Sequence, residues 1–298
     1  MRTSKTKAQL LKLSMLRISL ASYVVIVSGI IMIISSFAWM TISQNPAVGA
    51  LGFGIQIPGP ALVYETWDGS FADINNVEMD ENGVYIIKTP AEFATVMALS
   101  TDYKMYGVKN ITIKIANHLD MAGLEWTPIK IDSYAGFGTI TIQGEGHCMR
   151  GFSAPMFEGG FGGDAGIVIR DIAIVDSNIV SKNTQGSGAF IEVLDSVSTI
   201  ELDNCHLVRS TLYGSRAGGL IGWTAGYNNT SDGAVKSYVN IKNCSVDGCK
   251  ITGSGTVGGI IGQAGANAWT FQLLENCEVN NTTLTSTSSS NKGIGTMI

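Results

Sequence analysis

The sequence predicts an all-β protein, a right-handed parallel β-helix with a short N-terminal capping helix, preceded by one transmembrane helix. Three observations predict this class. A strand-like unit occurs twice in nearly the same form, at residues 200–226 and 239–266. The 298 residues include 36 glycines and only 14% charged residues, which is typical of β-rich repeats rather than helical proteins. One apolar stretch of membrane-spanning length lies at residues 18–42.

Residues 1–17 form a basic segment before this apolar stretch. They contain Arg2, Lys5, Lys7, Lys12 and Arg17, and no acidic residue. The positive-inside rule places them in the cytoplasm and the rest of the chain outside. Residues 18–42 are longer than the apolar region of most secretory signals, yet small residues at 36–38 and 48–50 also fit cleavage. We therefore expect a membrane-anchored surface protein, or a secreted one if the signal is removed.

Residues 43–63 are uncharged and contain several Pro and Gly residues, which predicts a spacer. Residues 64–157 are expected to form the N-terminal cap and the first rungs. Within them, Thr89 and Glu92 flank Pro90 and Ala91, a capping-box sequence that predicts a helix ending near Ser100. An open β-helix end exposes unpaired strand edges, so we expect this helix to cover that end.

Residues 158–298 are predicted to form the β-helix repeats. Ile200 and Leu202 alternate with acidic residues, as in a strand with one buried face, and Asn204 then interrupts the alternation. Equivalent residues follow at spacings of 33, 39 and 33 along the series Asp171, Asn204, Asn243 and Asn276. Asn tolerates the left-handed backbone of a sharp bend. We expect stacked bends with an amide ladder, less regular at Asp171.

Glycines flank an apolar pair in each unit, as GLIG at 219–222 and GIIG at 259–262. These strings resemble the GLUG motif of repeat-built bacterial surface proteins, and residues 83–157 are similar to the module that precedes such repeats. The resemblance implies an adhesin-like protein. The rungs at 155–160 and 187–193 depart from the glycine pattern, so we expect them to be distorted.

The last residues also align with a repeat. Ile298 falls opposite Ile261, inside a unit rather than after it. A natural solenoid end usually carries a polar cap. We therefore expect the β-helix repeats to be truncated at this end, as part of a longer protein.

The five cysteines of the sequence do not predict a metal site. Cys205, Cys244 and Cys277 share one repeat position, where parallel rungs would hold their side chains side by side, a poor geometry for disulfides. We expect a stack of buried thiols. Cys148 and Cys249 share no register with them, and no close Cys/His cluster is present in the sequence.

Two sets of polar residues are candidates for catalysis. Glu145 and His147 have the spacing of a pair that moves protons, although a turn explains them more simply. Glu201 and Asp203 face outward on one rung, as polysaccharide chemistry requires, but Lys242 lies on the next rung and no carboxylate pair is concentrated there. We therefore expect solvated faces, no catalytic residue, no cofactor and no enzymatic activity.

The favoured function is binding. A rigid acidic solenoid would present an extracellular surface to a glycan or protein, with a loop at 227–238 projecting from one side. The alternatives are a polysaccharide lyase or hydrolase, and a purely structural stalk. The membrane is a further partner through residues 18–42. Nucleic acid is disfavoured because the net charge is −5.

Overall fold

A computed structural model describes residues 64–100, 110–132, 138–161, 165–195, 198–225, 237–265, 270–289 and 293–295. All of them belong to one compact unit. The predicted cytoplasmic segment, membrane segment and spacer, most of the loop at 227–238, and Ile298 lie outside the described residues. Within the described ranges, no helix has both the length and the apolar character needed to cross a membrane.

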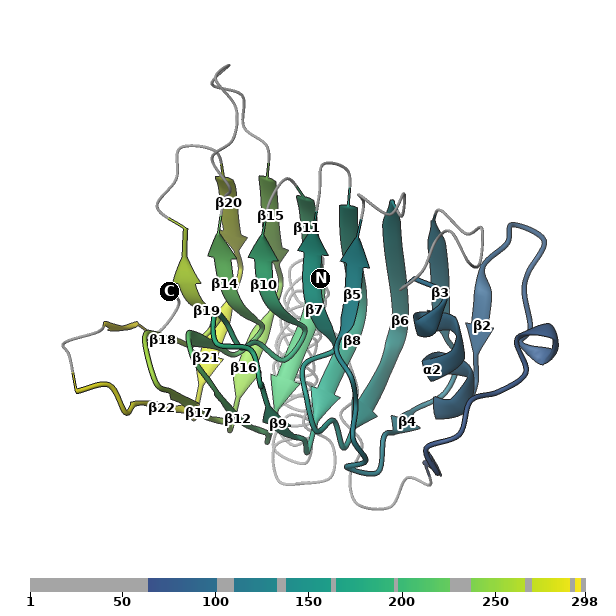
Figure 1. The fold of residues 1–298 in the computed structure, drawn as a ribbon, viewed down its shortest axis with the longest axis horizontal. Helices are drawn as coiled ribbons and strands as arrows, with labels where there is room; N and C mark the ends of the chain where they lie inside the picture. The colour runs from purple at the N-terminus through teal and green to yellow at the C-terminus, as the bar shows by residue number, and fades with distance from the viewer. Residues whose placement is uncertain are drawn as a thin grey trace, which may run out of the picture. The chain divides into compact units, whose positions relative to one another are not determined.

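Parallel β-strands make up most of the described unit, and one α-helix lies at one end of it (Figure 1). The strands belong to four sheets, and every pairing between named strands of the described residues is parallel. Sheet I contains β1 (Glu65–Thr66), β2 (Tyr85–Ile87), β3 (Ile111–Ile115), β4 (Leu119–Asp120), β6 (Thr139–Arg150), β8 (Ala165–Val175), β11 (Ser198–Val208), β15 (Ser237–Lys242), β16 (Ser245–Asp247), β20 (Thr270–Glu275) and β21 (Glu278–Asn280).

The other three sheets are smaller. Sheet II contains β5 (Ile129–Asp132), β7 (Phe157–Phe161), β10 (Ile191–Asp195), β14 (Ile221–Ala225) and β19 (Ile261–Ala264). Sheet III contains β9 (Asn178–Val180), β12 (Thr211–Gly214), β17 (Lys250–Gly253) and β22 (Thr283–Ser286). Sheet IV contains β13 (Ala217–Gly218), β18 (Val257–Gly258) and β23 (Ile294–Gly295).

The chain passes through these sheets in a repeating order. From β11 in sheet I it continues through β12 in sheet III, β13 in sheet IV and β14 in sheet II, and the strands from β15 to β19 repeat that order. We call each passage a coil and number the coils 1 to 6, at residues 111–132, 139–161, 165–195, 198–225, 237–264 and 270–295. Ile200 of coil 4 pairs with Ile167 of coil 3 and Val239 of coil 5. This arrangement is compatible with the predicted parallel β-helix.

The predicted corner is present. Asn204, Asn243 and Asn276 have φ of 54°, 53° and 52°, as a left-handed bend requires. Asp171 has φ of 55°, so the expectation of a less regular bend there was wrong. An aspartate also tolerates this conformation, and its Oδ1 accepts a hydrogen bond from Asn204 Nδ2 at 2.8 Å.

The expected amide ladder is continuous only in part. Asn276 Nδ2 donates to Asn243 Oδ1 at 3.2 Å. Asn243 Nδ2 instead donates to Asp203 Oδ1 at 2.8 Å. Asn204 Oδ1 lies 3.0 Å from His206 Nε2, within its own coil.

A second corner was not predicted. Positive φ values of 44°, 47°, 63° and 47° occur, in that order, at Asp176, Arg209, Gly248 and Asn281. The residues that follow form a row of Ser177, Ser210, Cys249 and Thr282, in which Ser177 N donates to Ser210 Oγ at 3.1 Å and Cys249 N to Thr282 Oγ1 at 3.3 Å. Cys249 therefore does not share the register of Cys205, Cys244 and Cys277, as expected, and takes the place of a hydroxyl residue in this second row.

The predicted helix is confirmed as α2 (Pro90–Ala98), and the 3-10 helix η1 (Ile74–Asn76) precedes it. Thr89 Oγ1 accepts from Glu92 N at 3.2 Å and Glu92 Oε2 accepts from Thr89 N at 2.9 Å, which completes the capping box. Leu99 is the C-cap, one residue before the predicted end. Three helix side chains are fully buried, namely Phe93, Val96 and Met97. The helix thus covers the apolar interior at this end of the stack, as expected of a cap.

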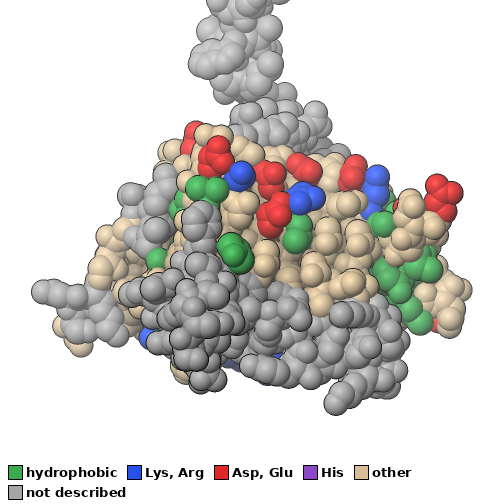
Figure 2. Space-filling view, turned by 90° about the horizontal axis from the view of Figure 1, so that it is seen from above, with side chains coloured by type: hydrophobic (Ala, Val, Ile, Leu, Met, Phe, Trp, Pro, Cys, Tyr) green, Lys and Arg blue, Asp and Glu red, His purple; other side chains and the backbone are tan. Residues whose placement is uncertain are grey.

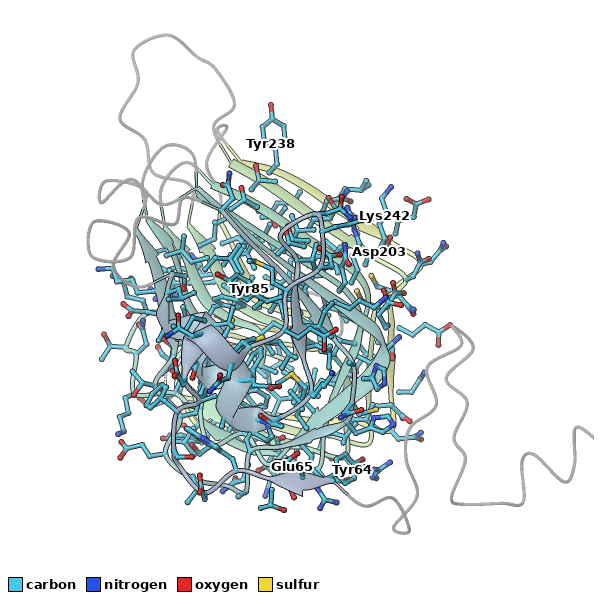
Figure 3. All side chains as sticks on the ribbon, turned by 90° about the vertical axis from the view of Figure 1, so that its right-hand side faces the viewer. Tyr64, Glu65, Tyr85, Asp203, Tyr238 and Lys242 are labelled. Atoms are coloured by element: carbon cyan, nitrogen blue, oxygen red, sulfur yellow. The ribbon has the colours of Figure 1, made fainter. Side chains whose placement is uncertain are left out.

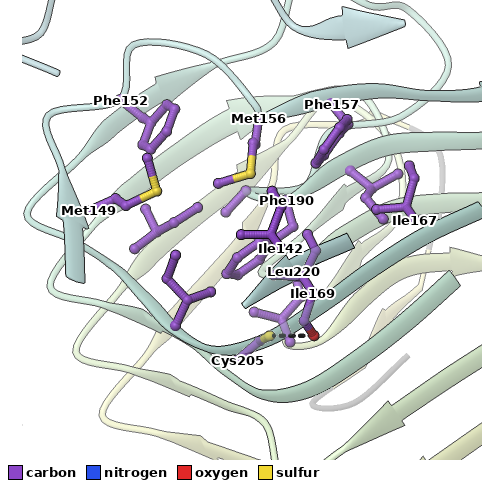
Figure 4. Close-up of a cluster of buried hydrophobic side chains, with 14 of the residues drawn as sticks. Ile142, Met149, Phe152, Met156, Phe157, Ile167, Ile169, Phe190, Cys205 and Leu220 are labelled. Atoms are coloured by element: carbon purple, nitrogen blue, oxygen red, sulfur yellow. Dashed lines mark hydrogen bonds between the residues drawn. The ribbon is translucent and has the colours of Figure 1, made fainter. Parts of the chain in front are cut away.

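Apolar side chains from successive coils fill the interior (Figure 4). Met149, Phe152 and Phe157 of coil 2 and Phe190 of coil 3 are at most 1% exposed. Cys205 lies in the same cluster, where its thiol donates to Ile169 O at 3.3 Å. The predicted inward position of this cysteine is confirmed.

Candidate functional site

A solvent-open hollow of about 510 Å³ lies beside sheet II at coils 1 to 3. We call it the Trp126 pocket, and its lining residues are Gly123, Glu125, Trp126, Thr127, Pro128, Ser153, Ala154, Glu158, Val180, Lys182, Asn183 and Glu192. Its volume falls within the range of about 300–1,000 Å³ that is usual for ligand sites. Apolar and hydrogen-bonding side chains are mixed along its walls.

The pocket exists because neighbouring coils turn this corner with connections of different length. Val180 N donates to Ser153 O at 2.9 Å, and Met156 N to Ala189 O at 3.0 Å, so these residues are equivalent across coils 2 and 3. Only two residues separate Ser153 from Met156, whereas residues 181–188 separate Val180 from Ala189. The longer connection of coil 3 extends past coil 2 and forms one wall of the pocket.

Two carboxylates lie side by side in this site. Ile191 pairs with Phe157 and Val193 with Gly159, so Glu192 of β10 lies next to Glu158 of β7, and both line the pocket. In coil 4 the equivalent residue is Gly222, since Ile191 also pairs with Ile221. Each carboxylate therefore occupies the place of a motif glycine.

The two rungs that carry these carboxylates were expected to be distorted. The pairing of β5 with β7 does shift register, between Ile129 and Lys130, which confirms a distortion at 155–160. The pairing of β10 with β14 keeps a constant offset from Ile191 to Asp195, so the expectation was wrong for the strand pairing at 187–193. There the sequence departure changes a side chain and leaves the pairing intact.

Glu192 is buried at the base of the coil 3 connection, with 3% of its surface exposed. Its Oε1 lies 2.6 Å from Ser181 Oγ, and its Oε2 accepts from Asn183 Nδ2 at 3.3 Å. Burial raises the pKa of Glu192 to about 7, the hydrogen bonds from Ser181 and Asn183 oppose this rise, and the charge of Glu158 adds to it. Ser181 Oγ also lies 3.2 Å from Gly186 O, so its hydroxyl is within hydrogen-bonding distance of both oxygens. A carboxyl that keeps its proton near neutral pH is suited to act as an acid.

The floor of the pocket is rigid. Trp126 is 5% exposed, and its Nε1 donates to Met156 O at 3.2 Å. Its ring stacks on Phe93 at 5.6 Å and meets Phe152 edge-on at 5.7 Å. These contacts fix one indole edge, so the pocket is largely preformed.

An ion pair joins two coils at the rim of the pocket. Lys182 Nζ of coil 3 lies 2.9 Å from Glu125 Oε1 of coil 1, and both side chains are at least 80% exposed. An exposed pair of this kind adds little stability. Its place on the lining instead adds one positive and one negative group that a bound ligand can reach.

The predicted pair Glu145 and His147 is part of the corner of coil 2. Glu145 has φ of 52° and lies 3.5 Å from Lys114 Nζ, and His147 Nδ1 lies 3.0 Å from Gly144 O. These contacts fit the simpler turn interpretation.

His118 and His147 lie together at a second hollow. Their ring centroids are 5.1 Å apart, and both line a hollow of about 360 Å³ together with Glu65 and Asn117. His118 Nδ1 accepts from Cys148 N at 2.9 Å, so its Nε2 carries the proton in the neutral ring and offers no lone pair to a metal. Among the described residues, no group of three or more potential ligands is arranged for a metal ion.

The predicted outward candidates Glu201 and Asp203 belong to a solvated face. Glu201 Oε1 lies 2.6 Å from Arg170 Nη2, and Lys242 on the next coil lies 3.2 Å from Glu275. Figure 3 shows Asp203 and Lys242 on the same outer side of the ribbon. Figure 2 shows acidic and basic side chains interspersed on one face of the unit. Among the described residues, Glu201 and Asp203 form no isolated carboxylate pair, because Glu201 is paired with Arg170 and Asp203 accepts from Asn243 Nδ2.

All five cysteines are free thiols, and only Cys277 is not fully buried. Cys205 N donates to Cys244 Sγ at 3.4 Å, which places two members of the predicted stack on adjacent coils. The expected stack of buried thiols is therefore confirmed for Cys205 and Cys244, whereas Cys277 is only partly buried.

No protein-family model and no curated protein matches this chain. A solved structure of a putative immunoglobulin A1 protease from Bacteroides ovatus is similar to it, with a TM-score of 0.42 and 15% identity over 74% of this chain and 84% of that chain. A similarity this low is evidence for neither the fold nor the activity of the present protein. The class that the fold and the pocket define is a repeat protein of stacked parallel strands with a carboxylate-lined hollow on its surface.

Proposed function

We propose that the chain is a right-handed parallel β-helix, tethered to a membrane through residues 18–42, that binds an extracellular glycan in the Trp126 pocket. The repeated order of the four sheets and the two stacked corners support the β-helix. The basic segment at 1–17 supports the orientation, because it places the solenoid outside the cell. The GLUG-like strings agree with an adhesin-like role at the cell surface.

The mixed lining of the pocket is the observation that carries the glycan proposal. Sugars present hydroxyl groups around apolar C–H faces. Val180 and Pro128 supply apolar walls, and Glu158, Asn183 and Lys182 supply acceptors and donors within reach of one ligand. Such a combination on a preformed floor is typical of sites for polar small molecules and polymers.

A glycan array tests this proposal. The 298-residue chain, purified in detergent because of its predicted membrane segment, is expected to be retained on a subset of glycans. Retention should persist at about 0.5 M salt, because close hydrogen bonds and packing are screened less than long-range charge. Retention on no glycan, or only on an array of host proteins, would contradict the glycan proposal.

A second function has one observation in its favour. Glu158 and Glu192 lie on adjacent strands in the same pocket, and paired carboxylates are the usual apparatus of glycoside hydrolysis. The alternative of a polysaccharide-active enzyme therefore finds support at a different site from Glu201 and Asp203.

A further inference from the structure

We propose that Glu158 and Glu192 hydrolyse a glycosidic bond of the bound glycan, with Glu158 as nucleophile, Glu192 as acid and base, and retention of the anomeric configuration. The inference rests on the proposed function, because the glycan held in the Trp126 pocket is its substrate. It goes beyond binding because it assigns a reaction to two residues. It replaces the expectation from the sequence that the chain has no catalytic residue.

The strand register favours the retaining course over the inverting one. Glu158 and Glu192 occupy matching positions on parallel neighbours, and such strands lie about 4.8 Å apart. Retaining glycosidases hold their two carboxyl groups about 5–5.5 Å apart, whereas inverting enzymes need about 6.5–9.5 Å to admit a water molecule. Side chains that leave adjacent strands together match the shorter separation.

Burial assigns the two roles. Two neighbouring carboxyls do not both ionise readily, because each charge disfavours the other. Glu192 is buried, and this burial outweighs the hydrogen bonds from Ser181 and Asn183, so Glu192 holds the shared proton. Glu158 is half-buried and is the better solvated of the two carboxyl groups, so it takes the role of nucleophile.

The reaction balances with water as the only co-reactant. A Glu158 oxygen bonds to the anomeric carbon while the glycosidic C–O bond breaks, and the departing oxygen keeps the electron pair and takes the proton of Glu192. Water then attacks the anomeric carbon and gives a proton to the Glu192 carboxylate. The ester bond breaks, its electron pair returns to Glu158, and both residues regain their first state.

The test uses the 298-residue chain in detergent and a glycan that the array shows it to retain. We expect new reducing ends, with the β or α configuration of the substrate kept in the first product seen by NMR. Glu158→Gln should lower turnover about a thousandfold or more and still retain the glycan. Glu201→Gln makes the same chemical change on sheet I and should leave turnover unchanged.

The proposed role of Glu192 as the acid is tested by a separate measurement. Glu192→Gln should lower turnover of the glycan about 10²–10⁴-fold, but far less for a dinitrophenyl glycoside of the same sugar, whose leaving group needs no proton. A 2-deoxy-2-fluoro glycoside of that sugar should label Glu158, as a mass shift on its peptide.

The two proposals fail in different ways. If the glycan is retained and no reducing end appears, hydrolysis is overturned and binding stands. If turnover is equal in Glu158→Gln and wild type, the assignment of residues is overturned. If no glycan is retained, the proposed function itself fails.

Discussion

Replacing Gly218 with alanine is expected to destabilise the protein by about 3–5 kcal/mol, or to prevent folding. A Cβ at this position would lie 2.0 Å from Ile221 O and 2.2 Å from Gly262 N. Both atoms belong to the backbone, one in the same coil and one in the next. These clashes could be relieved only if the adjacent coils separated. The substitution is therefore expected to weaken the stacking of the coils rather than the packing of one side chain.

Gly255→Ala is the matched control for this change. Its Cβ would meet nothing closer than Ser215 O at 3.6 Å, an ordinary contact. We expect an effect within about 0.5 kcal/mol. Denaturant unfolding followed by circular dichroism measures both variants, and equal losses in the two would contradict the close approach of the coils at Gly218.

Replacing Glu192 with glutamine is expected to stabilise the protein at pH 8 by about 3 kcal/mol and to have little effect at pH 4.5. The pKa of Glu192 is about 7 in the folded protein against 4.5 for the free side chain. The folded state therefore binds the proton more tightly, and wild-type stability falls as pH rises from 4.5 to 7. At about 1.4 kcal/mol per pKa unit, the loss is about 3 kcal/mol above pH 7.

The measurement is the unfolding free energy of wild type and variant between pH 4.5 and 8. Glu201→Gln serves as control, because Glu201 is partly exposed and paired with Arg170, and this change should bring no gain at pH 8. If wild type and Glu192→Gln show the same pH dependence, Glu192 is not a buried carboxyl that keeps its proton.

The first corner could be predicted from sequence because its residue type recurs. The recurring Asn204, Asn243 and Asn276 identify this corner directly. The capping box of α2 could be predicted as well, because it depends only on residues that are close in the sequence. The second corner was missed because Arg209 and Gly248 occupy it in two of the coils, and no shared letter reveals a shared backbone conformation.

The candidate site was missed for a different reason. Glu158 and Glu192 were visible as departures from the glycine pattern, but the departures were interpreted as distortion. Their adjacency depends on the pairing of β7 with β10, and the pocket depends on the longer connection at 181–188. A repeat alignment that asked which residue type replaces each motif glycine would have singled out both carboxylates.

Blocking the Trp126 pocket with a large side chain tests whether this pocket holds the ligand. Val180 lines the pocket and is 42% exposed, in a row of sheet III that continues through Tyr213 to Thr252. Tyr213 is 50% exposed, so this row accepts a large aromatic side chain. Val180→Trp would fill the pocket, and Thr252→Trp would place the same group outside it.

Titration of the retained glycan into both variants gives the answer. We expect Val180→Trp to weaken binding at least about tenfold, a loss of about 1.4 kcal/mol, and Thr252→Trp to bind as the wild type does. Wild-type affinity in Val180→Trp, or equal losses in both variants, would contradict this expectation.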